Sequence, residues 1–360
     1  MKAIAVERGS SQPTLLDVSE PIPDAGEALL RTLRVGIDGT DREVIQGNHG
    51  GYPVDDDYQI LGHEAVAAVE DPNGTDLKAG QLVVPTVRRP SVETDVDGGE
   101  YFERGEPDMA PDGAYVERGI VGAHGYMSEF FVSSPEFLVP VPDSYAEYGF
   151  LVEPISNSEK AFEHAFAARS AFEWTPESAL VLGNGPLGLL TLAMLETDTS
   201  PFERNYCLGR RDRPDPSIDI IERLGGTYVD SRETPVDRVA EAFEPMDFVY
   251  EATGYAKHAF QTVDALAPNG VGALLGIPND WAFEVDGGRL HRELVLENKA
   301  LFGSVNSNIG QYEAARERLS EFPDWFLDAF VTGVYAPQEV ESAFETGEDV
   351  IKTVVEFDTP

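Results

Sequence analysis

The sequence predicts an α/β protein of two domains, in which a β-rich domain precedes a doubly wound parallel sheet. Three observations support this prediction. The chain has 360 residues, more than one hydrophobic core of roughly 250–300 residues usually accommodates. Short apolar runs separated by Gly, Pro and Asp fill its first part. From about residue 178 to residue 306, strand-like and helix-like segments alternate.

A glycine motif opens the alternating region, between the apolar runs 179–182 and 189–195. Its positions are Gly183, Asn184, Gly185, Pro186, Leu187 and Gly188. Between a strand and a helix, the first glycine of such a motif permits a tight turn, and the second lets backbone approach a pyrophosphate. The third allows close packing, and the helix N-terminus offers free N–H groups to the phosphates. We therefore predict a dinucleotide-binding Rossmann domain.

The segments that follow complete this sheet. Further strands are expected at residues 206–208, 227–229, 248–250, 271–275 and 300–302. Helices are expected at residues 218–224, 236–243 and 256–266, the last of which should stop at residues 268–270. With the strand before the motif, six strands joined by helices make the doubly wound parallel sheet.

The β-rich part is expected to hold strands at residues 28–30, 66–69, 82–84 and 130–132. A linking helix should begin near Pro154, and the polar segment 91–118 should form an acidic surface lobe without metal. Residues 311–360 predict one helix and short strands that return to the first domain. The expected domains are therefore 1–172 with the linking helix, 173–306 for the dinucleotide, and 307–360 as the return.

The charge of the chain is strongly acidic. It has 65 acidic against 26 basic residues, a net charge of −39. In dilute buffer such a surface repels itself, whereas in molar salt the Debye length falls to about 3 Å and the repulsion is screened. Because the acidic residues are scattered among apolar segments, a disordered acidic tail does not explain them. The composition predicts a protein of a salt-rich cytoplasm.

Composition also excludes several classes of function. Without a basic patch, nucleic acid is not an expected partner. No apolar run reaches the roughly 20 residues of a membrane span, and residues 1–8 do not resemble a signal peptide. The single cysteine, Cys207, excludes an internal disulfide and reads as an inert core thiol.

The residues after the second strand of the sheet indicate which dinucleotide binds. Gly209, Arg210 and Arg211 stand where a carboxylate would bond the ribose 2′-hydroxyl of NAD. Guanidinium groups instead attract a 2′-phosphate and can bond two of its oxygens. With Arg213 close by, we predict NADP, while the neighbouring Asp212 leaves NAD open as an alternative.

Polar residues beside apolar strands mark the first domain. Gly62, His63 and Glu64 follow a strand-like run, residues 38–41 form an Asp-Gly-Thr-Asp box, and Glu153 follows an apolar tripeptide. Each alone is typical of a turn or a helix start. Combined with a mid-chain Rossmann fold, they resemble the medium-chain dehydrogenase/reductase superfamily over essentially the whole chain, which implies a GroES-like catalytic domain.

Within that superfamily, the chain is most similar to the archaeal glucose 1-dehydrogenases of the haloarchaeal type. The positions that carry this closer similarity are residues 117–120, 125–127, 153–155 and 303–306. The resemblance implies one catalytic zinc ion per subunit, held by Asp38, His63 and Glu153, with Glu64 as an alternating or neighbouring ligand. Many relatives carry cysteine in place of Asp38, but zinc also accepts carboxylate oxygen. No structural zinc is expected, because residues 91–118 contain no cysteine.

The activity that the resemblance implies is oxidation of an aldose, D-glucose first, to its aldonolactone. Hydride would pass from C1 to NADP while zinc acts as a Lewis acid on the anomeric hydroxyl. The catalytic residues implied are Asp38, Thr40, His63, Glu64 and Glu153. Those implied to contact the sugar are Thr40, Glu64, Glu117, Glu153, Asn157 and Asn306. The cofactor positions implied are the motif 183–188, Gly209, Arg210, Arg211, Leu275, Gly276, Ile277, Ser304, Val305 and Asn306.

Three alternatives stay open. The chain could be another zinc-dependent aldose, polyol or alcohol dehydrogenase, a noncatalytic NADP-binding sensor, or a metal-free quinone reductase.

Other expectations concern single residues and the assembly. Arg88 and Arg89 either reach the cofactor or substrate or form salt bridges. A homodimer is the expected assembly, with a tetramer as the alternative. The other five histidines, such as His49 and His124, are expected at the surface or in packing roles.

Overall fold

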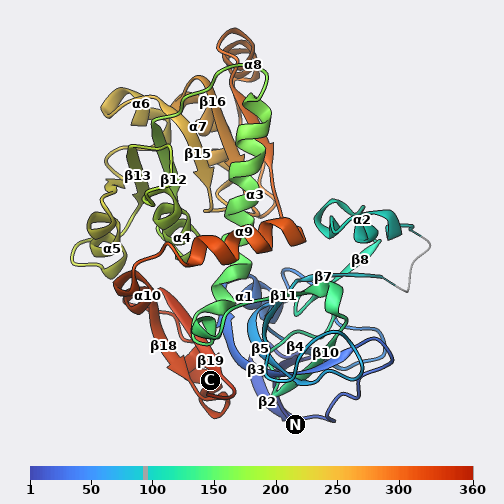
Figure 1. The fold of residues 1–360 in the computed structure, drawn as a ribbon. Coiled ribbons are helices and arrows are strands. Elements are labelled where there is room, and N and C mark those ends of the chain that lie inside the picture. Colours follow the sequence, from blue (N-terminus) through green and yellow to red (C-terminus); the bar gives the residue numbers. More distant parts are fainter. Residues whose placement is uncertain (92–95, 360) are drawn as a thin grey trace. The chain divides into compact units, whose positions relative to one another are not determined.

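The computed structural model describes residues 1–91 and 96–359 (Figure 1). Backbone contacts divide the chain into two compact units. Unit 1 comprises Met1–Ser156, Asn306–Ser320 and Phe330–Pro360, and unit 2 comprises Asn157–Val305 and Glu321–Ala329. The expected limits of the folding domains, at residues 172 and 306, stay a prediction.

Unit 2 is built on a six-stranded sheet in which all neighbouring strands are parallel. From edge to edge, its strands are β14 (Thr227–Asp230), β13 (Arg204–Gly209), β12 (Ser178–Leu182), β15 (Met246–Glu251), β16 (Leu266–Leu274) and β17 (Ala300–Gly303). The chain direction across the sheet reverses between β12 and β15, and the carboxyl ends of the strands at such a point bind ligands in open α/β sheets. The predicted doubly wound sheet is confirmed.

Helices connect these strands. Between residues 152 and 296 they are α3 (Val152–Arg169), α4 (Pro186–Leu195), α5 (Pro216–Leu224), α6 (Val239–Ala242), α7 (Ala256–Ala265) and α8 (Gly287–Leu296). Helix α5 shows how the sequence sets such bounds. The Asp215 carboxylate accepts hydrogen bonds from the first-turn N–H groups, Pro216 opens the helix, and Gly225 ends it in a left-handed conformation with φ 113°.

Two expectations in this region were wrong in detail. The helix expected over residues 256–266 ends at Ala265, and β16 already includes residues 268–270, which were expected to be a break. Pairing of Leu266 with Met246 begins the strand early, before a register shift in β15. Residues 236–243 hold only a 3-10 turn and the four-residue α6.

Unit 1 contains three sheets. The main sheet follows the order β11 (Leu138–Pro140), β6 (Leu82–Pro85), β5 (Glu64–Asp71), β3 (Ala28–Ile37), β19 (Lys352–Glu356) and β18 (Val331–Tyr335), and β10 (Phe130–Ser133) also pairs with β3. A second sheet has the order β2 (Pro13–Asp17), β1 (Lys2–Glu7) and β4 (Tyr58–Ile60), and a third has β7 (Arg88–Pro90), β8 (Tyr115–Arg118) and β9 (Gly122–Ala123). The four expected strands of this region are confirmed.

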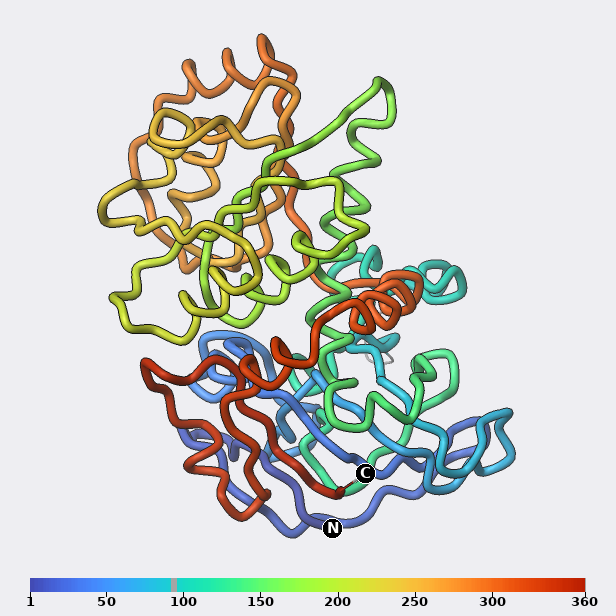
Figure 2. The backbone as a smooth tube through the Cα atoms, turned by 60° about the vertical axis from the view of Figure 1, so that its left-hand side comes forward, coloured from blue at the N-terminus to red at the C-terminus, as the bar shows by residue number. Residues whose placement is uncertain are grey.

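The end of the chain returns to the beginning, as expected. Strand β19 pairs antiparallel with β3, so that the red C-terminal strands lie beside the blue N-terminal ones in Figure 2. The tail was expected to hold one helix, but the structure has three: α9 (Ile309–Leu319), α10 (Asp324–Phe330) and α11 (Val340–Phe344). Most of α10 belongs to unit 2.

The remaining helices are α1 (Gly39–Gln46) and α2 (Gly99–Glu103). The surface lobe expected over residues 91–118, of which 92–95 lie outside the described residues, contains the short helix α2 and strand β8. In each unit, apolar side chains from the strands form a core, including Ile4, Val35 and Val83 in unit 1 and Leu180 and Val249 in unit 2. Within the described chain, no helix has the length and apolar character to cross a membrane.

Candidate functional site

Four carboxylates surround His63 in unit 1. One ligand atom from each of His63, Glu64 and Glu153 lies within 4.8 Å of the other two, and the same holds for Asp38, Asp41 and His63. All but Asp38, which is half-buried, are buried. The structure therefore brings the three expected carboxylates to the imidazole of His63, and adds a fourth carboxylate, Asp41. A single ion on Asp38, His63 and Glu153 together stays a prediction.

A helix cap places two of these carboxylates. Asp38 precedes α1, and its Oδ1 accepts from the Asp41 N–H at 3.0 Å while Asp41 Oδ2 accepts from the Asp38 N–H at 3.0 Å. The other oxygens face the imidazole, because Asp38 Oδ2 lies 3.6 Å from His63 Nε2 and Asp41 Oδ1 lies 3.9 Å from His63 Nδ1. The two aspartates that cap the start of α1 thus also lie on either side of the His63 imidazole.

Gly62 sets the position of His63. Its φ is 84°, a left-handed conformation that suits glycine. A Cβ at this residue would lie 2.6 Å from Met127 Cγ and 2.7 Å from Val35 Cγ1. The Gly62 N–H also donates to Asp41 Oδ1 at 3.0 Å. Both packing and hydrogen bonding therefore fix the turn that leads into β5.

Glu64 forms an ion pair with Lys352 deep inside unit 1. The two side chains are 3% and 1% exposed. Glu64 begins β5 and Lys352 begins β19, on either side of β3. Between them, Gly36 of β3 leaves the necessary room, because a Cβ there would lie 2.3 Å from Glu64 Oε2 and 2.9 Å from Lys352 Cε.

The cluster has an excess of buried negative charge. Burial, and after it the nearby Asp38 carboxylate, raise the pKa of Asp41 to about 7. Burial opposes a charge on His63, but Asp38, Asp41 and Glu153 outweigh it and hold the pKa of His63 well above its usual range. Burial also raises the pKa of Glu64 against the opposing effect of Lys352. Without a further cation, protons must offset the carboxylates.

The donor set fits a divalent cation such as zinc. Imidazole nitrogen and carboxylate oxygen are both zinc ligands. The buried Nδ1 of His63 has no hydrogen-bond partner within the described chain, so it is available either to an ion or, as N–H, to Asp41. The second arrangement is common around zinc, where the other ring N–H of a ligating histidine meets a carboxylate.

A buried ion pair holds Glu117, one of the residues implied to contact the sugar. Arg88 Nε donates to Glu117 Oε1 at 2.9 Å, and Arg88 Nη1 donates to the Asp108 carbonyl at 2.9 Å. Asn306 Nδ2 also donates to Glu117 Oε1, at 3.3 Å. Arg88 thus takes the salt-bridge role. Arg89 instead donates to Thr86 and Tyr126.

In unit 2, the glycine motif lies at the carboxyl end of β12. Gly183 has φ 113°, and a Cβ at Gly188 would lie 1.8 Å from the Gly183 carbonyl oxygen, so these two glycines serve the turn and the close packing. A Cβ at Gly185 would meet nothing within 4 Å. Gly185 caps α4 without a side-chain hydrogen bond, which leaves the helix N–H groups open to a phosphate.

The other expected cofactor positions lie after neighbouring strands. Leu275 and Gly276 donate their N–H groups to the Glu251 carbonyl at the end of β15. Ser304 follows β17, and its buried hydroxyl has no partner within the described residues. Ile277 and Val305 are 68% and 51% exposed. A buried orphan hydroxyl and exposed large apolar side chains fit a ligand that supplies both kinds of contact.

The loop after β13 presents the expected arginines. Arg210 is exposed, and Arg211 Nε lies 3.9 Å from Asp215. Arg213 is engaged by Glu222 in an exposed ion pair and is therefore less available than the sequence indicated. Gly209 is required by packing, since a Cβ there would lie 2.5 Å from Asn184 Oδ1.

Three expected residues remain to be placed. Thr40 is half-buried in the first turn of α1. Glu153 and Asn157 stand four residues apart on α3, a spacing that puts them on one face of the helix. Burial raises the pKa of Cys207 to about 12, as expected for an inert thiol.

Sequence reasoning missed the role of Lys352. The sequence did mark Lys352 as unusual, because it is one of only six lysines and lies two residues before the apolar pair Val354-Val355. Its partner could not be inferred, since 288 positions separate it from Glu64 in the chain numbering.

Comparisons with known proteins agree with this geometry. The profile described as alcohol dehydrogenase GroES-like domain matches residues 24–143, and the profile described as glucose dehydrogenase C-terminus matches residues 146–357. The chain is 63% identical over 359 residues to a glucose 1-dehydrogenase of Haloferax mediterranei, covering 100% of both chains. It is 36% identical over 370 residues to a glucose 1-dehydrogenase of Methanocella arvoryzae, covering 99% of both.

A solved structure is also similar throughout. The Haloferax mediterranei glucose dehydrogenase in complex with NADP, Zn and gluconolactone has a TM-score of 0.97 at 62% identity, with 100% of both chains covered. A sequence identity of 62% over the full length indicates a shared family as well as a shared fold. The chain belongs to the glucose 1-dehydrogenase family of the medium-chain dehydrogenase/reductases.

Proposed function

We propose that this protein is a zinc-dependent glucose 1-dehydrogenase that transfers hydride from C1 of D-glucose to NADP and forms the gluconolactone. The observation that carries the proposal is the buried acidic cluster around His63. Its charge excess calls for a cation, and the chain is 62% identical to an enzyme whose structure contains NADP, Zn and gluconolactone. Relatives with the same name in Haloferax and Haloarcula support work in a salt-rich cell interior.

The residues of the chain divide the work. Asp38, His63 and Glu153 would hold the zinc, with Glu64 as a direct or neighbouring ligand. When bound, zinc supplies Lewis-acid polarisation of the C1 hydroxyl. Asp41 orients the imidazole through its Oδ1, 3.9 Å from His63 Nδ1. Thr40, Glu64 and water are the candidates to carry the hydroxyl proton away.

Glu117, Asn157 and Asn306 are proposed to bind the sugar hydroxyls. Arg88 fixes Glu117 on one side, and Asn306 reaches the same carboxylate oxygen from a left-handed backbone position with φ 57°. A site held in this way rejects sugars that lack a hydroxyl, because its buried polar groups would then be left unpaired. Selection among aldoses is therefore expected to depend on Glu117.

In unit 2, the glycine motif, Gly276 and Ser304 are proposed to bind the cofactor backbone, and Arg210 and Arg211 its 2′-phosphate. The absence of a carboxylate at residue 209 favours NADP over NAD. Because Asp212 adjoins the arginines, residual activity with NAD is expected.

Steady-state kinetics in molar KCl tests the proposal. Glucose, galactose, xylose and a polyol are each assayed with NADP and with NAD, with and without added zinc after chelation. The proposal expects the highest kcat/KM for glucose with NADP and loss of turnover on chelation. Highest activity with a polyol would favour the alternative dehydrogenase, and cofactor binding without turnover would favour the NADP-binding sensor.

The proposed assembly is a homodimer through the β17 edge of the unit 2 sheet. An edge strand carries unpaired backbone groups that a second strand can satisfy. Exposed aromatic residues in the same unit, Tyr255, Phe260 and Trp281, form tilted or edge-to-face contacts with neighbouring rings. Light scattering in molar KCl distinguishes the homodimer from a tetramer or a monomer.

A further inference from the structure

The loop that carries Arg210 and Arg211 is held from one side by the end of strand β14 and the turn after it. The Ser231 N–H donates to the Gly209 carbonyl at 2.8 Å. Tyr228 Oη accepts from the Arg211 N–H at 2.8 Å and donates to the Arg211 carbonyl at 3.0 Å. One phenol group therefore fixes both ends of the Arg211 backbone.

This fixation matters for the direction of the arginine side chains. A guanidinium recognises a phosphate through a rigid fork of donors, so its use depends on where its backbone stands. Arg210 is exposed, and no acidic group within residues 1–91 and 96–359 pairs with it. The Tyr228 ring also packs closely on Gly209, where a Cβ would lie 2.9 Å from Tyr228 Cε2. Tyr228 thus sets the shape of the loop by contact and by hydrogen bonds.

A second residue controls the charge of the loop. Asp212 follows the two arginines and is 84% exposed, and a carboxylate beside them would repel a phosphate. Arg232 Nη2 donates to Asp212 Oδ1 at 2.7 Å, and the same guanidinium bonds Asp230 through Nε at 2.9 Å. Arg232 therefore holds the Asp212 carboxylate in an ion pair and, because it also pairs with Asp230, offsets part of its charge.

We propose that Tyr228 and Arg232 are positioning residues that select a 2′-phosphorylated adenosine over the unphosphorylated one. Tyr228 holds the Arg210–Arg211 backbone in the phosphate-binding shape. Arg232, which pairs with both Asp230 and Asp212, offsets part of the negative charge that Asp212 places beside the 2′-phosphate. The inference rests on the proposed use of NADP. Tyr228 and Arg232 lie outside the cofactor motif, 17 or more positions after the arginines, and would act on cofactor choice through the loop.

The test separates cofactor selection from stability. Tyr228→Phe removes both hydrogen bonds but keeps the ring, and should raise KM for NADP by about 5- to 30-fold. Arg232→Gln should raise it by about 3- to 10-fold. In both variants, kcat with NADP and KM for NAD should stay within about twofold of the wild type. Adding Asp212→Asn to Arg232→Gln should lower KM for NADP again, because the carboxylate next to the arginines is then gone and only that of Asp230 has lost its partner.

Matched controls come from the same unit. Tyr206 lies on the neighbouring strand β13, and its phenol donates to Glu244 at 2.8 Å; Tyr206→Phe removes this hydrogen bond. Arg238→Gln breaks an exposed ion pair with Glu241. Neither should change the ratio of KM for NADP to KM for NAD. Arg232→Lys should recover part of the loss.

The inference is overturned if Tyr228→Phe and Arg232→Gln change KM for both cofactors equally, or leave the ratio within about twofold. Calorimetric titration with 2′,5′-ADP and with 5′-AMP gives the same answer without turnover, since only the first carries the 2′-phosphate. Failure of the proposed function would be seen separately, as a wild-type protein that binds 2′,5′-ADP but oxidises no aldose.

Discussion

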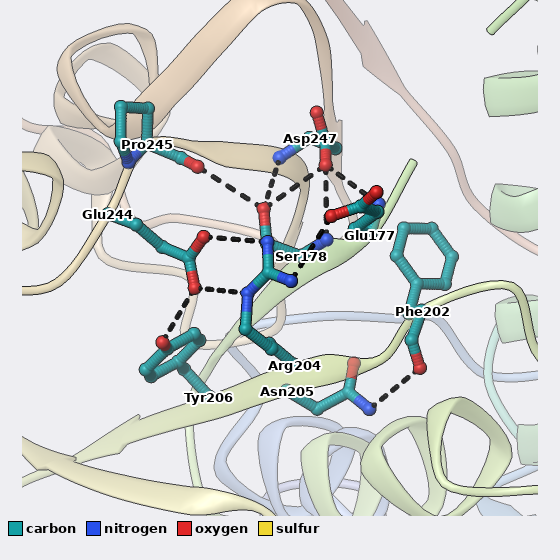
Figure 3. Close-up of polar contacts among 9 residues, drawn as sticks. All are labelled: Glu177, Ser178, Phe202, Arg204, Asn205, Tyr206, Glu244, Pro245 and Asp247. Carbon is teal, nitrogen blue, oxygen red and sulfur yellow. Dashed lines mark hydrogen bonds and ion pairs between the residues drawn. The ribbon is translucent and has the colours of Figure 1, made fainter. Parts of the chain in front are cut away.

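Two polar clusters of this protein have a similar excess of acidic groups but opposite surroundings. At the amino end of the unit 2 sheet, Arg204 bonds Glu244 at 2.7 Å and Glu177 at 3.2 Å, and Asp247 accepts from Ser178 (Figure 3). Around His63 in unit 1, four carboxylates meet one imidazole and one lysine. In both places, carboxylates outnumber the cations.

Burial makes the difference. The side chains of Arg204, Glu177 and Glu244 are 43%, 59% and 25% exposed, so water shares in balancing their charge. His63, Glu64 and Lys352 are 6%, 3% and 1% exposed. There, an excess of negative charge must be met by protons or by a metal ion. The same imbalance is therefore shared with water in one cluster and confined to the interior in the other, where we propose that a metal ion offsets it.

Removing His63 should have the largest effect. In His63→Ala the cluster loses the one residue shared by both groups of potential ligands. Loss of a Lewis acid that contributes several kcal/mol lowers kcat/KM for glucose by about 10³-fold or more. The measurement is NADP reduction in molar KCl with zinc in excess. His49→Ala, at an exposed histidine, is the matched control and should keep full activity. Comparable activity of the two variants would contradict a metal-binding cluster.

Breaking the buried ion pair comes next. Lys352→Met leaves Glu64 without its partner in the interior, which should lower the free energy of unfolding by about 3–5 kcal/mol. Urea unfolding in molar KCl measures the change. Lys78→Met, at an exposed lysine, should change it by less than about 0.5 kcal/mol. The double variant Lys352→Met/Glu64→Gln should regain part of the loss, and no recovery would show that Lys352 stabilises through packing alone.

Lys352 also shows where sequence reasoning stops. The six-stranded sheet, the glycine motif and the cluster of His63 with Asp38, Glu64 and Glu153 follow from local patterns and from family resemblance. Local patterns work for α5, whose cap, proline and final glycine are all within the helix or next to it. The Glu64–Lys352 pair depends on β19 joining β3, a contact between the two ends of the chain.

The same limit explains the smaller errors. Residues 268–270 contain proline, asparagine and glycine, which favour a turn, yet β16 already begins at Leu266. Leu266 pairs with Met246 and Val271 pairs with Phe248, so the residues between them form an irregularity of the strand. The tertiary pairing of Leu266 thus starts the strand before the turn-forming residues. The roles proposed for Tyr228 and Arg232 were missed for a related reason, because helix α5 separates these residues in the sequence from the loop that they hold.

Metal binding by the cluster around His63 should depend on pH. In the metal-free protein, Asp41 has its pKa raised from 3.8 to about 7, and the pKa of His63 is raised above 6.5. Between the unfolded and folded values, the folded state binds more protons than the unfolded state, so stability falls as the pH rises. For Asp41 this window spans about pH 4–7, and for His63 it starts near pH 6.5.

Zinc should therefore raise the melting temperature more at about pH 8 than at about pH 5, because at the lower pH it must displace bound protons. Thermal unfolding in molar KCl with zinc and with chelator gives the two differences. An equal shift at both pH values would mean that the metal does not replace those protons. Arg204→Gln serves as a control background, since its cluster should add nothing to the zinc effect.

The smallest effect is expected at the exposed cluster itself. Arg204→Gln removes the ion pairs with Glu244 and Glu177, yet all three side chains keep contact with solvent. The free energy of unfolding should fall far less than in Lys352→Met, and kcat/KM for glucose should not change. Urea unfolding at low and high KCl adds a second reading, because screening should shrink even this small difference. A loss as large as that of Lys352→Met would mean that burial does not separate the two clusters, and that the charge excess around His63 needs another explanation.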